Sequence, residues 1–239
     1  MRKLTRLWRR IASPSRITVR GQRLSLASPH IDAQLKRQLY RERYEVQKLR
    51  QINFKIEPND VVLDIGAGIG LTALYAATMV GPENVLAIEA DARACEIARD
   101  NFALNHLDID LTFAAAVPCA AHAAADTVDF YVNDELGRSS LFPRAGGLEP
   151  VQVPVVDVKS VLAARDISAL IVDVQGSEFA LFADIDDFRA VRVILLTIHE
   201  QVMGYDRSVD LLKTLFDKGF ALDFPYSRGQ RISLARRHF

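Results

Sequence analysis

A glycine-rich segment, VVLDIGAGIG at residues 61–70, has the residue types and spacing of a cofactor-binding loop. Its apolar run predicts a strand that ends at Asp64, and Leu71 begins a helical pattern directly after the last glycine. Glycine lets the backbone turn tightly and approach a ligand closely because it has no Cβ. The free N–H groups of the following helix would face the same ligand. The predicted cofactor contacts in this loop are Gly66, Gly68 and Gly70.

Two acids indicate which cofactor this loop binds. A dinucleotide-binding loop needs glycine or alanine three positions after its second glycine, and Leu71 occupies that position. Asp64 would attract the ammonium group of an amino-acid-like ligand and would repel a pyrophosphate. Glu89, which ends the next apolar run 25 residues later, would accept hydrogen bonds from both hydroxyls of a ribose. These residues favour S-adenosylmethionine over the less favoured alternative, a nicotinamide-dependent oxidoreductase.

Polar residues also follow two later apolar runs. Asp173 and His199 end neighbouring predicted strands, so their side chains are expected at the same edge of the sheet. Methyl transfer is an in-line displacement that also needs a base when the acceptor is a hydroxyl. We therefore predict Asp173 and His199 as base and orienting partner, with Glu178 as a third catalytic candidate. Each candidate also has a structural alternative. Asp173 could cap the next helix, His199 could be a hydrogen-bonded structural residue, and Glu178 could be an acid that stabilises the first turn of a helix. Their spacing matches no dedicated metal motif, so no metal is predicted.

These residues need a parallel sheet to position them. Apolar runs alternate with helical patterns, which is typical of a Rossmann-like, doubly wound α/β fold with a mostly parallel sheet. The predicted strands are residues 61–65, 85–89, 111–117, 170–174 and 193–198, and the predicted helices are residues 71–80, 92–105, 178–182 and 209–218. Residues 127–156 interrupt the alternation with two extended pieces around a Gly/Pro-rich loop. We predict that they form an inserted β-rich flap over the carboxyl edge of the sheet.

The charge distribution divides the chain. Of its 239 residues, 49% are hydrophobic and 25% charged, which is ordinary globular composition. Residues 1–50, however, hold 14 Lys and Arg against three acids. We predict a basic, helical N-terminal extension at 1–51, with helices at 2–11 and 31–51, followed by one domain at 52–239. Nucleic acid is not an expected partner, because the region of the catalytic candidates is acidic and lacks an N/D-P-P-Y/F motif.

The first eleven residues combine an apolar stripe with basic side chains. Leu4, Leu7, Trp8 and Ile11 have helical spacing among five Lys and Arg. This pattern predicts peripheral contact of residues 1–11 with an anionic membrane surface or an acidic partner, and packing on the protein's own domain is the alternative. No signal peptide or membrane-spanning run is recognisable, and neither Cys95 nor Cys119 belongs to a metal motif. We expect a cytoplasmic protein, with contact at the inner membrane face.

Several motifs together resemble the FkbM-type S-adenosylmethionine-dependent methyltransferases. The likeness covers about residues 40–225 and includes Tyr44-Glu45, DIGAGIGLTAL, IEAD, Leu104-Asn105, Ser139-Ser140-Leu141 and DVQGSE at 173–178. The resemblance implies a Rossmann-like methyltransferase fold, with Asp91 and Asn105 as further cofactor contacts. It also implies methyl transfer to a hydroxyl group of a sugar, a glycan or another small molecule.

Two positions depart from the family pattern. The family has an acid where this chain has Gln175, and usually a second acid where this chain has Thr197. Glutamine keeps the hydrogen bonds of glutamate but cannot take up a proton or balance the charge of a metal. A catalytically weak or inactive cofactor-binding or scaffold protein of the same fold is therefore the main alternative function.

Overall fold

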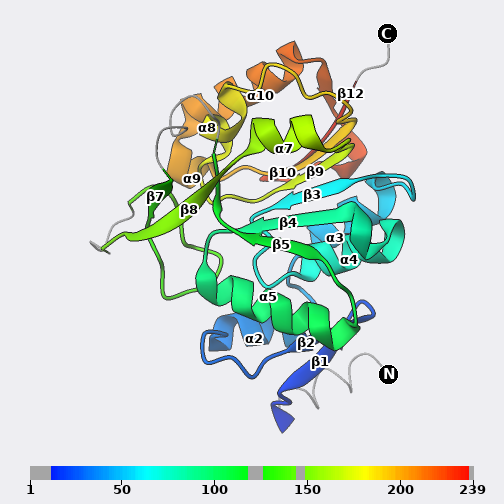
Figure 1. Ribbon diagram of the computed structural model, residues 1–239, viewed down its shortest axis with the longest axis vertical. Coiled ribbons are helices and arrows are strands. Elements are labelled where there is room, and N and C mark those ends of the chain that lie inside the picture. Colours follow the sequence, from blue (N-terminus) through cyan, green and yellow to red (C-terminus); the bar gives the residue numbers. More distant parts are fainter. Residues whose placement is uncertain (1–11, 118–125, 144–148, 237–239) are drawn as a thin grey trace.

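The computed structural model describes residues 12–117, 126–143 and 149–236 (Figure 1). Its centre is a seven-stranded sheet with the strand order β11-β12-β10-β9-β3-β4-β5. Six of these strands run in the same direction, and β12 is antiparallel to both of its neighbours. The strands are β3 (Val62–Ile65), β4 (Val85–Glu89), β5 (Asp110–Phe113), β9 (Ala169–Val172), β10 (Val193–Thr197), β11 (Phe220–Leu222) and β12 (Arg231–Arg236). All residues of β3, β9 and β10 are buried, which explains why these strands are apolar except for Asp64 and Thr197.

Helices cover both faces of this sheet, so the predicted doubly wound α/β fold is confirmed. In Figure 1, α7, α8 and α10 lie above the sheet, and α3 (Val46–Lys55), α4 and α5 lie below it. Successive strand residues supply two separate cores, because Val62 packs with α4 and α5 whereas Leu63 packs with α7, α8 and α10. The helices are α4 (Leu71–Val80), α5 (Ala92–Asn105), α7 (Val158–Ala164), α8 (Glu178–Ala183), α9 (Glu200–Met203) and α10 (Tyr205–Asp217), with 3-10 turns η1 (Pro82–Asn84) and η2 (Phe224–Tyr226).

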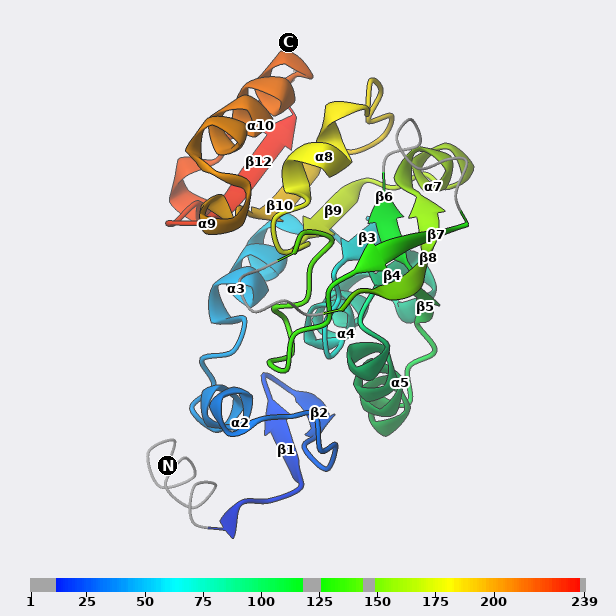
Figure 2. The same ribbon diagram turned by 90° about the vertical axis from the view of Figure 1, so that its left-hand side faces the viewer.

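The predicted insertion does form β structure, but it begins earlier in the chain. The expected strand at 111–117 divides into β5 and β6 (Ala115–Val117), and β6 leaves the main sheet. It pairs in parallel with β8 (Val151–Asp157), which pairs antiparallel with β7 (Thr127–Phe130). In Figure 2 the loop that follows β7 lies between α3 and this small sheet. The insertion is therefore joined to the main sheet through the residues that continue β5.

Between the two helices predicted for the N-terminal extension, the structure has a β-hairpin that the sequence analysis did not predict. Residues 16–25 form a hairpin of β1 (Arg16–Val19) and β2 (Gln22–Ser25). Arg20 and Gly21 both have positive φ, 52° and 91°, as a two-residue turn of this hairpin type requires. Alternate residues of β1 are buried, and its side chains Ile17 and Val19 join the same core as α4 and α5.

The helical pattern at 31–51 also divides in two. The helices are α2 (Ala33–Tyr40) and α3 (Val46–Lys55), so the predicted domain boundary after residue 51 falls inside α3. Glu42 and Glu45 interrupt the pattern with positive φ of 55° and 50°. Leu39 and Leu49 belong to the core under the sheet, which makes this segment part of the main fold. The predicted helix at residues 2–11 and Cys119 lie outside the described residues. Within the described part, no helix has the length and apolar character needed to cross a membrane.

Candidate active site

A cavity of about 330 Å³ lies at the carboxyl ends of β3, β4 and β9. Its floor is the β3–α4 loop with Gly66 and Gly68, and its walls come from α2, α3, the loop at 135–141 and the loop at 173–177. Parallel α/β sheets bind their ligands at this edge. Of the residues predicted from the sequence, those that line the cavity are Gly66, Gly68, Glu89, Asp91 and Asp173.

Each of the three glycines of the loop is required for a different structural reason. A Cβ on Gly66 would lie 2.0 Å from the carbonyl oxygen of Asp173, so this glycine allows the loops after β3 and β9 to touch. Gly68 has a φ of +57° and its nearest neighbour is the hydroxyl of Tyr44 across the cavity floor. Gly70 precedes α4 and does not line the cavity, and a Cβ there would collide with Phe102 of α5. The structure gives Gly70 a packing role, and its contact with the cofactor stays a prediction.

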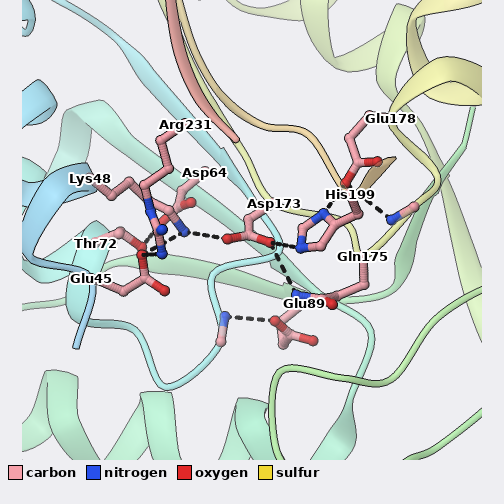
Figure 3. Close-up of polar contacts among 12 residues, drawn as sticks. Glu45, Lys48, Asp64, Thr72, Glu89, Asp173, Gln175, Glu178, His199 and Arg231 are labelled. Atoms are coloured by element: carbon pink, nitrogen blue, oxygen red, sulfur yellow. Dashed lines mark hydrogen bonds and ion pairs between the residues drawn. The ribbon is translucent and has the colours of Figure 1, made fainter. Parts of the chain in front are cut away.

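Glu89 faces the cavity at the end of β4, as predicted. Its two carboxylate oxygens accept hydrogen bonds from the backbone N–H groups of Gly68 at 2.6 Å and Asp91 at 2.8 Å (Figure 3). Each oxygen keeps a second lone pair that can accept a hydrogen bond from a hydroxyl group. Burial raises the pKa of Glu89 to about 7, and the backbone hydrogen bonds oppose this rise. Ala114, Ala115 and Phe130 line the cavity near this strand with apolar surface suited to a flat base, which the sequence did not indicate.

Asp91 joins the cavity wall to the insertion. Its side chain caps α5 by accepting from the backbone N–H of Arg93, and it also forms an ion pair with the Arg93 guanidinium at 2.6 Å. The hydroxyl of Ser139, in the inserted segment, donates to the same carboxylate at 2.9 Å. Burial opposes the ionisation of Asp91, but the hydrogen bonds and charge of Arg93 outweigh it and lower the pKa. This pairing leaves Asp91 ionised at one end of the cavity.

Two predicted cofactor contacts lie away from the cavity surface. Asn105 is at the last turn of α5, where its side-chain amide bonds both backbone groups of Arg23 in β2. These bonds give Asn105 a structural role, and its contact with the cofactor stays a prediction. Asp64 is 1% exposed and accepts a hydrogen bond of 2.6 Å from the hydroxyl of Thr72, which lines the cavity. Burial raises the pKa of Asp64 to about 6. Asp64 therefore acts on the site through Thr72 and through its charge.

The three catalytic candidates do come together, but only Asp173 faces the cavity. Figure 3 shows His199 between two carboxylates, with Nδ1 2.6 Å from Glu178 and Nε2 3.5 Å from Asp173. Glu178 is fully buried and also accepts from the backbone N–H of Gly176. Neither His199 nor Glu178 lines the cavity. The structure places both residues behind Asp173, and their direct roles stay predictions.

Asp173 is surrounded by hydrogen-bond donors. Lys48 approaches one oxygen at 2.7 Å, and the side-chain amide of Gln175 donates to the other at 3.3 Å. Burial opposes the ionisation of Asp173, but the charges of Lys48 and His199 and the hydrogen bonds of Lys48 and Thr197 lower its pKa. Gln175 and Thr197 are the two positions that depart from the family pattern. Both residues donate a hydrogen bond to Asp173, whereas an acid at either position would repel its carboxylate.

Residues of α3 complete the wall, and the sequence analysis placed them in a separate extension. Lys48 is 5% exposed and also forms an ion pair of 3.2 Å with Glu45. Burial opposes the charge of Lys48, but Asp173 and Glu45 outweigh it and raise the pKa. Tyr44 lies beside them, and burial raises the pKa of its phenol above the usual range. The motif Tyr44-Glu45 was the only signal in the sequence for this part of the site.

The residues present fit the predicted cofactor. Glu89 offers acceptors for two hydroxyls, the apolar end suits a base, and the carboxylates near Gly66 and Gly68 suit a cationic amino-acid group. Within the described ranges, no group of three or more His, Cys, Asp or Glu side chains is arranged to hold a metal ion. The absence of a metal in the protein stays a prediction.

The fold and the site define a Rossmann-like methyltransferase domain that uses S-adenosylmethionine. The chain belongs to the family described as the methyltransferase FkbM domain, whose model matches residues 64–222. This match confirms the resemblance found in the sequence and its cofactor. The matched range includes Glu89 and Asp173 but begins after α3, so Lys48 lies outside it.

Known methyltransferases resemble this chain either over a short segment or at low sequence identity. The ribosomal protein L11 methyltransferase of Caldicellulosiruptor saccharolyticus is 40% identical over 63 residues, which is 26% of this chain and 20% of the relative. The protein of the same name from Pelobacter propionicus is 43% identical over 61 residues, or 24% of this chain and 19% of the relative. The chain thus matches about a fifth of the length of these relatives.

Solved structures of methyltransferases also resemble this chain, at low sequence identity. The ribosomal protein L11 methylase of Lactobacillus delbrueckii subsp. bulgaricus has a TM-score of 0.45 and 18% identity, covering 80% of this chain and 78% of that chain. The tRNA (uracil-54, C5)-methyltransferase of Pyrococcus abyssi, in complex with S-adenosyl-L-homocysteine, has a TM-score of 0.48 and 16% identity, covering 92% of this chain and 42% of that chain.

Proposed function

We propose that this methyltransferase transfers the methyl group of S-adenosylmethionine to a hydroxyl group of a sugar, a glycan or another small molecule. The observation that carries the proposal is the Asp173 carboxylate, which lines the cavity beside the glycine loop and is held ionised by its donors. A hydroxyl acceptor needs such a group, because it must lose its proton to become an ether.

The low pKa of Asp173 decides how it acts. A carboxylate of this kind is a weak base toward a free alcohol, so Asp173 accepts a hydrogen bond from the hydroxyl and orients its lone pair. When bound, the cofactor supplies a methyl group on a positively charged sulfur. The attacking hydroxyl becomes strongly acidic only as its oxygen bonds the methyl carbon and the sulfur leaves as a neutral thioether, and Asp173 can then take the proton. His199 and Glu178 hold the carboxylate in position from behind.

The remaining cavity wall suits a polyhydroxylated acceptor. Side-chain amides of Gln34, Gln38 and Gln175 line it together with Glu135 and Arg138. These groups donate and accept hydrogen bonds in the mixed pattern that sugar hydroxyls need. The rival proposal, a weak or inactive cofactor-binding protein, was motivated by Gln175 and Thr197. Both residues donate to Asp173 in this structure, which supports a site adapted to them.

The experiment is a methyl-transfer screen with S-adenosylmethionine labelled on the methyl group. The acceptors are glycans, sugar nucleotides, hydroxylated small molecules and, as a contrasting class, ribosomal proteins. The position of the methyl group on any product is then determined by NMR. An O-methyl ether whose formation is lost in Asp173→Ala supports the proposal. A product methylated only at nitrogen or carbon contradicts it, and cofactor binding without transfer to any acceptor favours the scaffold alternative.

A further inference from the structure

The cavity wall holds more negative than positive charge. Among the described residues that line it, six are acids, including Glu45, Glu89 and Asp173, and two are bases, Lys48 and Arg138. Arg138 is about half exposed and is paired with Glu135, so its charge is both screened and balanced. Lys48 is therefore the buried cation of the described wall, and it faces two carboxylates.

The Lys48–Asp173 pair lies next to the glycine loop. The backbone of Asp173 touches Gly66 so closely that a Cβ on that glycine would overlap it. Tyr44, one turn before Lys48, approaches Gly68 with its hydroxyl. Burial strengthens the effect of both charges on anything in the cavity, because the local dielectric constant is far below that of water.

The methyl donor and its product differ in one charge. S-adenosylmethionine carries a positive sulfonium, whereas S-adenosylhomocysteine has a neutral thioether at the same position. We propose that the Lys48–Asp173 pair sets the preference of this cavity for S-adenosylmethionine over S-adenosylhomocysteine. Asp173 favours the sulfonium, Lys48 limits that attraction, and the surplus of carboxylates favours release of the neutral product after each transfer. This inference rests on the family's cofactor and is independent of the identity of the acceptor.

The test is calorimetric titration of both ligands into the full chain at one pH and one salt concentration. The measured quantity is the ratio of the two Kd values, product over donor. Asp173→Asn is expected to lower this ratio about fivefold or more, and Lys48→Met to raise it by a similar factor, as expected for one charge in a partly buried site. The double variant should return close to the wild-type ratio. Lys55→Met is the matched control, because Lys55 lies on the same helix as Lys48, does not line the cavity and loses an ion pair with Asp223.

The single variants separate an electrostatic role from a structural one. A pair that only shapes the cavity would change both Kd values in parallel and leave their ratio constant, which would overturn the inference. The inference would also be overturned if the ratio shifted in the same direction in both single variants. If Lys48→Met fails to fold, Asp173→Asn and the double variant decide the sign, because neither leaves an unpaired buried carboxylate at this pair. Failure of the wild type to bind either ligand would instead contradict the cofactor assignment.

Discussion

The Lys48 ammonium lies 2.7 Å from the Asp173 carboxylate, although 125 residues separate the two in the chain. This contact joins α3, which precedes the matched family domain, to the loop after β9. Two further bonds fix α3 beside β12, from the side-chain amides of Gln47 and Gln51 to backbone carbonyls near that strand. The segment before residue 52 is therefore part of the active site as well as of the core.

Truncation tests this dependence. A chain that begins at residue 52 would lose α2, part of α3 and the hairpin, and with them the buried side chains of Leu24, Leu39 and Leu49. Each such loss costs about 2–5 kcal/mol, so we expect no cooperative unfolding transition in circular dichroism. A chain that begins at Ser13 keeps all of these residues and is the control. A cooperatively folded 52–239 fragment would contradict the prediction.

The glycine loop can be dissected with two alanine variants. Gly70→Ala would collide with Phe102 and force alanine into a positive φ, so we expect a loss of about 2 kcal/mol or more in unfolding free energy. Gly68→Ala also has a positive φ, but its Cβ meets nothing closer than the Tyr44 hydroxyl at 3.4 Å. It should therefore weaken cofactor binding more than stability. Urea unfolding and calorimetry measure the two effects, and equal losses of stability would refute the distinction.

Much of the fold could be predicted because its causes are local. Strands buried on both faces leave continuous apolar runs, and β3, β4 and β10 were recognised from them. A motif does not separate ligand contact from packing, however, so Gly70 and Asn105 were assigned to the cofactor although they bond or pack against neighbouring elements. Lys48 was missed because its partner is set by tertiary structure. The hairpin at 16–25 was missed because the segment was interpreted only by its basic charge. Its alternation of buried and exposed residues, which is typical of strands, was overlooked.

Glu89 should make stability depend on pH. Its pKa is about 7 in the folded protein against an ordinary value of 4.5, so the folded state binds more protons than the unfolded state across this range. The unfolding free energy of the free protein should therefore fall as pH rises from about 4.5 to 7, by at most about 3 kcal/mol. The shift of Asp64 acts with the same sign.

Urea unfolding at pH 5 and pH 8 measures this dependence. Glu89→Gln keeps an oxygen for the Gly68 N–H and should flatten the pH dependence, whereas Glu96→Gln, on the exposed side of α5, should not. Glu89→Gln should also weaken binding of S-adenosylmethionine by roughly 1–3 kcal/mol, because the ribose hydroxyls lose a charged acceptor. An unchanged pH dependence in Glu89→Gln would show that its pKa is not raised.

Peripheral membrane contact through residues 1–11 stays a proposal from the sequence. Five basic side chains and Trp8 should bind anionic vesicles with about 1 kcal/mol for each charge near the surface. We expect the full chain to sediment with phosphatidylserine vesicles at low salt and to be released at high salt. A chain that begins at Ser13 should stay in the supernatant. Equal sedimentation of the two chains, or equal binding to uncharged vesicles, would disprove a role for this segment.

Gln175→Glu restores the acid that the family has at this position, and the structure predicts that this variant is impaired. Gln175 donates to Asp173 at 3.3 Å, so glutamate would remove a donor and place a like charge beside a buried carboxylate. The pKa of Asp173 should rise from its lowered value, because like charges oppose ionisation. The acidic limb of the pH profile for methyl transfer should move upward accordingly, so the loss of kcat/KM should be larger at acidic pH than near pH 8. Gln201→Glu, an exposed position in α9, is the control for the added charge. Higher activity in Gln175→Glu, or activity that appears only with an added divalent cation, would show that the family's acid suits this site and that glutamine weakens it.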